Sequence, residues 1–509
     1  MLIWWYTRTS LWEDEIIAIT HTLQPLPLFF IETLRNDIHP PLYFLQLKFW
    51  HDIGLRSDAA VLFNSVICAL LSLATLFTVA FKVYDKKTAY YATALFALFP
   101  IFSYGGGNLR MYGLLPACVL LVWYANRNWF VTRERKWLVW AVIFEAATSY
   151  MHAIEFFFVG FIAIAACAEC FFHARRMAAV AGQETNTGLR AWVLVQCIVL
   201  LLIMPLMLSG IVRGSEASAP TSVMELLTQP GALIAGWAPA SIFSIRLAGF
   251  LIFLFLAAAA MLESRSRMRT LIAVIATLVV AIIISMLAKP MIKVPVFAAS
   301  LLPILALGAG AGIAMHAKRY WRIGAFSCMG ILALAALPLM QYQMTSDNYG
   351  ETGRLIKRLA QPGDIVVVPN VSVYWGVMRY AVGENWGKPL HILPMQPNPQ
   401  WEKVINKLGT KTSDVLGLRP STDRVVSNGV TYVIGENAQK ITENANRVWV
   451  VQRNGFRVDV HLGARFIRDS IYRPKSIDAE GSDGLAISLF VKNDKGETIA
   501  RHPLKTLPN

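Results

Sequence analysis

The stretch from Ala60 to Phe81, AVLFNSVICALLSLATLFTVAF, decides the fold class of this chain, because it contains no charged side chain. A helix needs roughly 20 mainly apolar residues to cross a bilayer. The basic run Lys82–Lys87, KVYDKK, follows directly. The pattern therefore predicts a membrane-spanning helix that ends at a basic loop.

Similar apolar stretches recur along the first 340 residues. We expect spans at residues 60–81, 88–105, 109–125, 137–151, 153–172, 191–212, 245–262, 270–288, 294–315 and 321–340. The chain is 55% hydrophobic and 16% charged, whereas an ordinary soluble protein is about 25% charged. This composition excludes a disordered chain and predicts a mainly α-helical, polytopic membrane bundle with about ten spans.

Basic residues gather in alternate loops between these spans. One set of loops holds Lys82, Lys86, Lys87, Arg127, Arg133, Arg135, Lys136, Arg175, Arg176, Arg190, Arg265, Arg267, Arg269, Lys318, Arg319 and Arg322. The opposite short loops hold only Arg110, Arg213, Lys289 and Lys293. The positive-inside rule places the first set in the cytoplasm. It also accounts for the net charge of +15 without a nucleic-acid partner.

Ten spans with this orientation place both ends of the chain outside. Residues 1–58 would then form an outer segment with no helix before it, although it contains Arg8, Arg35, Lys48 and Arg56. Such side chains cross a membrane only at high cost. We therefore expect the native chain to start upstream of Met1, with an eleventh span and a cytoplasmic N-terminus.

The composition changes near residue 341, where the chain becomes polar and rich in turn residues. We predict a transmembrane domain over residues 1–340, with residues 1–58 as its outer loop, and an extracytoplasmic α/β domain over residues 341–509. Alternating patterns predict helices at residues 353–359, 374–382 and 401–408, and strands at 365–369, 391–393, 430–434, 448–451 and 485–491. Neither a nucleotide-binding glycine motif nor a metal-ligating Cys/His set is visible.

Three adjacent carboxylates follow Trp12, at Glu13, Asp14 and Glu15. One interpretation is the acidic first turn of an interfacial helix, where carboxylates complement the helix dipole. The other is a general base, which would take a proton from an acceptor hydroxyl. On the sequence alone both interpretations stay open.

Two further clusters fall on the same predicted outer side. The segment His39–Tyr43, HPPLY, fixes a turn before the amphipathic run Leu42–Ile53, and His39 is either a helix cap or a functional group. The segment Gly105–Tyr112, GGGNLRMY, is expected to form a tight hairpin between two spans. Arg110 in this segment needs a partner.

Two interpretations of Arg110 follow from its predicted place at the membrane surface. A structural ion pair would join it to Asp14, Glu15 or Glu145. Alternatively its guanidinium group would bind a phosphate, for which its geometry is suited. Lys289 and Lys293 add two outer cations, which either anchor the chain at the interface or bind the same anion.

The ordered motifs Trp12–Glu15, His39–Tyr43 and Arg110–Tyr112 resemble those of the integral-membrane glycosyltransferases of the GT-C fold. The resemblance is to the bacterial branch with protein O-mannosyltransferases and the lipid A aminoarabinose and galacturonic acid transferases. It covers about the first 340 residues. In that branch a Trp-x-Asp-Glu stretch lies in the first outer loop, a His-Pro-Pro-Leu segment follows, and an Arg-x-Tyr motif opens a later span.

The resemblance implies a hexosyl- or pentosyltransferase that takes a sugar from a polyprenyl-phosphate donor, with inversion, to a hydroxyl of a glycan, lipid or protein. The implied catalytic residues are Asp14, as general base, and Glu15. The implied substrate-binding residues are His39, Arg110, Tyr112, Lys289 and Lys293. The implied location is the outer face of a bacterial inner membrane, among its lipids.

The sequence around the outer loop predicted between spans 270–288 and 294–315 departs from the pattern of this family. Relatives often carry an Arg-Tyr pair where this chain has Val294–Phe297, so Lys293 is the expected substitute cation. A divalent cation as cofactor is left open, because no dedicated ligand set is visible. Two other functions stay open as well: a transporter or flippase of a lipid-linked substrate, and an inactive scaffold that keeps the fold.

Overall fold

The computed structural model describes residues 10–23, 25–27, 29–30, 33, 39–152, 154–181, 188–213, 233–234, 243–263, 266–288, 294–345, 349–368, 371–383, 424–434, 445–453, 466–472 and 485–492. The chain forms two compact units. Unit 1 comprises Met1–Tyr6 and Asp37–Met340, and unit 2 comprises Thr7–Asn36 and Gln341–Asn509. Residues 7–36 thus group with the C-terminal third of the chain.

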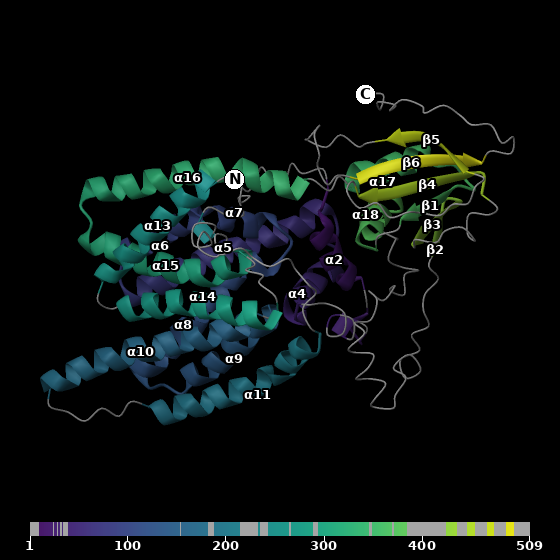
Figure 1. The fold of residues 1–509 in the computed structure, drawn as a ribbon. Helices are drawn as coiled ribbons and strands as arrows, with labels where there is room; N and C mark the ends of the chain where they lie inside the picture. The colour runs from purple at the N-terminus through teal and green to yellow at the C-terminus, as the bar shows by residue number, and fades with distance from the viewer. Residues whose placement is uncertain are drawn as a thin grey trace. The chain divides into compact units, whose positions relative to one another are not determined.

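Unit 1 is a bundle of long helices (Figure 1). Its helices are α4 (Pro41–Asp52), α5 (Asp58–Val83), α6 (Lys86–Leu98), α7 (Pro100–Gly107), η1 (Met111–Gly113), α8 (Leu115–Thr132), α9 (Lys136–Met151), α10 (Glu155–Ala181), α11 (Leu189–Arg213), α13 (Phe243–Leu262), α14 (Arg267–Ala288), α15 (Val294–His316) and α16 (Arg319–Thr345), the last of which runs past the end of the unit. Each expected span coincides with helical residues, although two of them differ from the observed helices in their bounds. Four described segments are long and apolar enough to cross a membrane: Asp58–Val83, Leu189–Met207, Ile245–Leu262 and Phe297–His316.

Two expected spans differ from the observed helices, and proline explains both differences. The expected span at 88–105 is two helices, because Phe99 before Pro100 is extended (φ −65°, ψ 127°), as residues before proline usually are. The expected span at 109–125 begins only at Leu115, with Pro116 in its first turn. Gly105–Gly107 therefore end helix α7 and do not form the expected hairpin.

Helix α15 forms the centre of unit 1 and packs against α6 and α13. Its apolar window is completely buried inside the bundle. Small residues permit this close packing: a Cβ atom on Gly310 would lie 2.7 Å from the backbone of Ala92 in α6. Glycine contacts of this kind are typical of helices that pack within a membrane.

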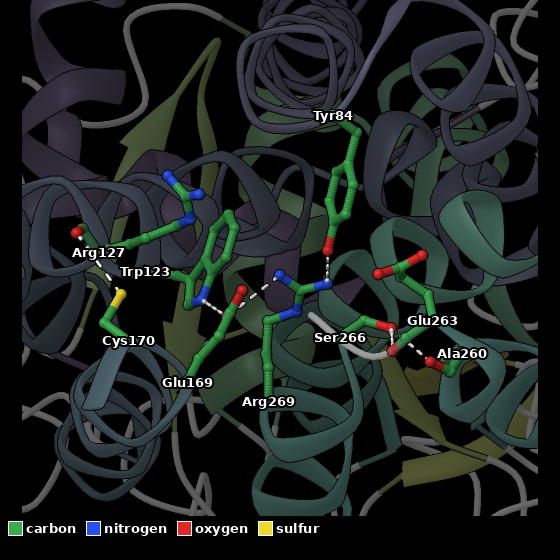
Figure 2. A network of polar contacts seen from close by, with 9 residues as sticks. All are labelled: Tyr84, Trp123, Arg127, Glu169, Cys170, Ala260, Glu263, Ser266 and Arg269. Carbon is green, nitrogen blue, oxygen red and sulfur yellow. Dashed lines mark hydrogen bonds and ion pairs between the residues drawn. The ribbon is translucent and has the colours of Figure 1, made fainter. Parts of the chain in front are cut away.

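A fully buried arginine joins several helices where the basic loops lie (Figure 2). The Arg269 guanidinium group of α14 donates to Tyr84 Oη, at the end of α5, over 2.8 Å. It also pairs with the Glu169 carboxylate of α10 at 3.4 Å. The same guanidinium lies 4.4 Å from the ring centroid of Trp123 in α8, and the Trp123 indole donates to Glu169 over 3.2 Å.

The turn between α13 and α14 is fixed beside this arginine. The Ser266 hydroxyl donates to the carbonyl oxygens of Ala260 and Glu263, the latter over 3.0 Å. The Glu263 side chain is buried and lies 3.9 Å from His316 at the end of α15. Hydrogen bonds and ring contacts thus hold the Arg269 side chain from the end of α5, from α8 and from α10 (Figure 2).

Unit 2 contains a six-stranded mixed sheet in the order β2-β3-β1-β4-β6-β5. The strands are β1 (Ile365–Val368), β2 (Arg424–Ser427), β3 (Val430–Ile434), β4 (Arg447–Arg453), β5 (Phe466–Tyr472) and β6 (Leu485–Lys492). Strand β1 pairs in parallel with β3 and β4, and the other pairs are antiparallel. All four residues of β1 are buried, as expected for a central parallel strand.

Three described helices accompany this sheet: α2 (Glu13–Thr22), α17 (Tyr349–Leu359) and α18 (Val371–Ala381). Helix α18 contacts strands β1, β3 and β4, and it also contacts α17 and α2. The α/β architecture predicted for the C-terminal third is confirmed in the described residues. The elements expected at 391–393 and 401–408 lie outside the described residues.

Candidate functional site

The predicted site residues fall in both units, and each unit is described by itself. Asp14 and Glu15 belong to unit 2. His39, Arg110 and Tyr112 belong to unit 1. Lys289 and Lys293 lie outside the described residues.

The acidic segment forms the first turn of helix α2. The carbonyl oxygen of Trp12 accepts hydrogen bonds from the backbone N–H groups of Glu15 and Ile16, both over 3.1 Å. In return the Trp12 N–H group donates to the Glu15 carboxylate over 3.1 Å. Glu15 therefore caps its own helix, which is a structural use of a carboxylate at the third helical position.

Asp14 differs from Glu15 in its exposure. Glu15 is completely buried, whereas Asp14 is only partly buried. Asp14 lies in the first turn of α2. The arrangement gives the two neighbouring acids different surroundings, with Asp14 as the more accessible one.

The Arg110 segment is held in place by close backbone packing in unit 1. Arg110 is extended and 5% exposed, and its N–H group donates to the Asn108 carbonyl over 2.8 Å. A Cβ atom on Gly113 would lie 3.0 Å from the Gly105 carbonyl oxygen and 3.1 Å from that of Ser65. Only glycine fits there without a shift of the surrounding backbone. Close backbone packing at Gly113 therefore fixes the position of the turn that carries Arg110.

Helix α5 also holds this turn by hydrogen bonds. The Ser72 hydroxyl of α5 donates to the Gly113 carbonyl over 2.7 Å and accepts from the Ala117 N–H over 3.2 Å. Ala117 lies in the first turn of α8 and also donates to the Leu114 carbonyl over 3.0 Å, so its N–H group is shared between Leu114 and Ser72.

Rings from three separate segments meet at His152. The His39 and His152 ring centroids are 4.8 Å apart, and Tyr112 lies 6.5 Å from His152. Tyr104 of α7 lies 6.0 Å from Tyr112. The segments before α4, after α7 and after α9 thus converge, and the structure brings His39 and Tyr112, from two of the motifs, to one place.

His152 is a residue that the sequence did not assign to the site. It follows α9 in an extended conformation and is 2% exposed. Its Nδ1 atom accepts from the Ile154 N–H over 3.2 Å, so the proton of the neutral ring lies on Nε2. The available signal was its place beside the predicted outer turn between two spans.

Helix α15 is tied to the His152 turn by a buried carboxylate. The Ser300 hydroxyl of α15 donates to Glu155 Oε1 over 2.5 Å, and both residues are buried. The Glu155 N–H group donates to the His152 carbonyl over 2.9 Å. Helix α15 begins at Val294, directly after Lys293 in the sequence, and this link connects the helix to the ring cluster.

Glu145 is not the partner of Arg110. Its carboxylate accepts from Asn126 Nδ2 over 2.7 Å and from Gln196 Nε2 over 3.1 Å. The Trp192 indole then donates to Asn126 Oδ1 over 2.6 Å. These bonds join α8, α9 and α11, so Glu145 belongs to a separate polar cluster within the bundle. Across the described part of the chain, no group of three or more His, Cys, Asp or Glu side chains is placed to hold a metal ion.

The fold and the two groups of residues define a polytopic helical membrane protein with an α/β unit. No family model matches the sequence, and a sequence search of characterised proteins finds no relative. Two solved structures are similar over 96% of this chain and 96% of their own: ArnT from Cupriavidus metallidurans in the apo state (11% identity, TM-score 0.55) and the same protein bound to undecaprenyl phosphate (12% identity, TM-score 0.57). The GT-C fold indicated by the three motifs is therefore confirmed.

Proposed function

We propose that this chain is a glycosyltransferase that moves a sugar from a polyprenyl-phosphate donor to an acceptor hydroxyl. The observation that carries the proposal is the convergence of His39 and Tyr112, from two separate motifs, on His152. A fold alone supports many functions, so the argument depends on these residues. The similarity to ArnT bound to undecaprenyl phosphate supports a lipid phosphate as the ligand.

The donor phosphate is assigned to unit 1. Arg110, on its fixed turn, supplies a guanidinium group that can bind two phosphate oxygens at once. Lys289 and Lys293, in the loop before α15, add point charges. The long apolar helices place this unit in a bilayer, and the polyprenyl tail would lie in the same bilayer. These cations would stabilise the negative charge that builds up on the leaving phosphate.

Asp14 is assigned the role of general base for the acceptor hydroxyl. Its carboxylate takes the proton of the acceptor hydroxyl, and the acceptor oxygen forms a bond to the anomeric carbon of the sugar. The bond between that carbon and the phosphate oxygen breaks, and its electron pair leaves with the polyprenyl phosphate. Attack from the face opposite the leaving group inverts the anomeric carbon. Glu15 keeps Asp14 in place by capping α2.

The location follows from the charge of the loops. Basic residues concentrate in alternate loops, which supports an orientation with the C-terminal unit outside a bacterial inner membrane. The transferred group is a hexose or a pentose, and the acceptor is a hydroxyl of a glycan, lipid or protein.

The test is transfer of label from a panel of radiolabelled polyprenyl-phosphate sugars in membranes that contain the full chain. Asp14→Asn should abolish transfer while the protein stays folded in the membrane. Asp52→Asn is the matched control, because the Asp52 carboxylate is half exposed and pairs with Lys48 at 3.1 Å. The absence of transfer from every donor by folded wild-type protein, or transport of the lipid without transfer, would reject the proposal.

A further inference from the structure

Helix α2, with the acidic segment, packs on helix α18 of the C-terminal third within unit 2 (Figure 1). The backbone N–H of Leu11 donates to the Tyr380 hydroxyl over 2.7 Å, across 369 positions of sequence. Leu11 is completely buried. The start of α2 is therefore bound to a side chain that lies in none of the three sequence motifs.

This bond is adjacent to the cap of α2. The N–H group of Leu11 is satisfied by Tyr380, and the next one, of Trp12, is satisfied by Glu15. Asp14 is two residues further along, in the turn that these two bonds hold. One bond inside α2 and one bond to α18 thus hold the turn that carries Asp14.

Tyr380 is itself firmly placed by helix α17. A Cβ atom on Gly353 of α17 would collide with Tyr380 Cβ and would lie 2.8 Å from the Tyr380 carbonyl carbon. The same helix pair has a second contact of this kind, where the Tyr349 ring covers Gly376. Helix α18 in turn contacts the central strands β1, β3 and β4. A rigid α/β frame therefore presents the Tyr380 hydroxyl to Leu11.

We infer that Tyr380 is a positioning residue for Asp14, and that the C-terminal α/β unit is the frame that holds the base of the proposed transfer reaction. The inference rests on the proposed function. Catalytic groups act at full rate only when they are held close to the productive geometry, and small displacements are costly. Loss of the Tyr380 hydroxyl would let the first turn of α2 move and would leave the donor site in unit 1 unchanged.

Tyr380→Phe tests this inference, because it keeps the ring and the Cβ atom that packs on Gly353 and removes only the hydroxyl. We expect kcat to fall about fivefold, the loss typical of one hydrogen bond, while KM for the lipid donor stays at the wild-type value. Amide exchange in a peptide covering residues 11–20 should become faster. Tyr432→Phe is the matched control, since Tyr432 is buried on strand β3 of the same unit; it should change neither kcat nor this exchange.

Wild-type kcat in Tyr380→Phe would overturn the inference, and so would a fall in kcat that comes with an equal rise in donor KM. Exchange that does not change in residues 11–20 would overturn it as well, whether or not the protein is a transferase. If wild-type protein transfers no sugar, the proposed function is wrong. If wild-type protein transfers sugar but Tyr380→Phe behaves like Tyr432→Phe, only the positioning role fails.

Discussion

The buried arginine of Figure 2 offers the sharpest test of the energetics of unit 1. Replacing Arg269 by methionine removes its ion pair with Glu169, its hydrogen bond to Tyr84 and its position over the Trp123 ring. The Arg269 side chain is 0% exposed and that of Glu169 is 9% exposed. Solvent therefore cannot replace the lost positive charge beside Glu169.

Removal of one partner from a buried ion pair costs about 3–5 kcal/mol. We therefore expect Arg269→Met to lower the free energy of unfolding by about 4 kcal/mol. The double variant with Glu169→Gln should recover roughly half of that loss, because the amide can still accept from the Trp123 indole and carries no charge.

The assay is unfolding by titration with a denaturing detergent in mixed micelles, followed by tryptophan fluorescence. Arg267→Met is the matched control, because Arg267 is exposed and donates to the Met261 carbonyl; it should change the free energy of unfolding by less than about 1 kcal/mol. A loss below about 1 kcal/mol in Arg269→Met, or no recovery in the double variant, would refute the reasoning.

Two other predictions concern the turns of unit 1. Gly113→Ala should lower the thermal stability and weaken donor use, because its Cβ atom would lie 3.0 Å from the Gly105 carbonyl oxygen and 3.1 Å from that of Ser65; thermal unfolding and donor KM check this, and wild-type values would contradict it. Asp85→Ala should cost about 1 kcal/mol, because the Asp85 carboxylate caps α6 by accepting from the Thr88 N–H over 2.6 Å. This bond holds the pKa of Asp85 below its ordinary value of 3.8. The cap therefore contributes in full above that pH, and the difference from Asp85→Ala should vanish as the pH falls through the lowered pKa; a difference that grows in acid would contradict the assignment.

Apolar runs predicted the helices of unit 1 well, because burial in a bilayer or a bundle leaves a strong compositional signal. The helix boundaries that proline sets could have been predicted from the sequence. Pro100 breaks one expected span and Pro116 delays another, and both follow from rules for the residues around proline.

Two strands of unit 2 were not predicted. Strand β2 is only four residues long, yet Asn428 and Gly429 after it form a recognised hairpin signal with strand β3, so this omission was avoidable. Strand β5 carries an irregularity between Arg468 and Ser470, which interrupts the alternation that marks a strand.

The site was predictable only where the chemistry lay in local motifs. His39 and Tyr112 were found from such motifs, whereas His152 becomes part of their cluster only through the packing of α9 against α4. The bond from Leu11 to Tyr380 joins segments 369 positions apart, and no local pattern encodes such a contact. That Glu15 caps α2 while Asp14 stays more accessible likewise follows only from the three-dimensional structure.

The most direct test of the central claim is to measure donor binding and turnover in parallel on purified wild-type and Asp14→Asn proteins. Native mass spectrometry would give the affinity for undecaprenyl phosphate, and label transfer would give the rate. The account predicts that Asp14→Asn binds the lipid phosphate as tightly as wild type and transfers sugar at least about a thousandfold more slowly. Transfer at the wild-type rate by Asp14→Asn, or wild-type protein that does not bind the lipid phosphate, would contradict it.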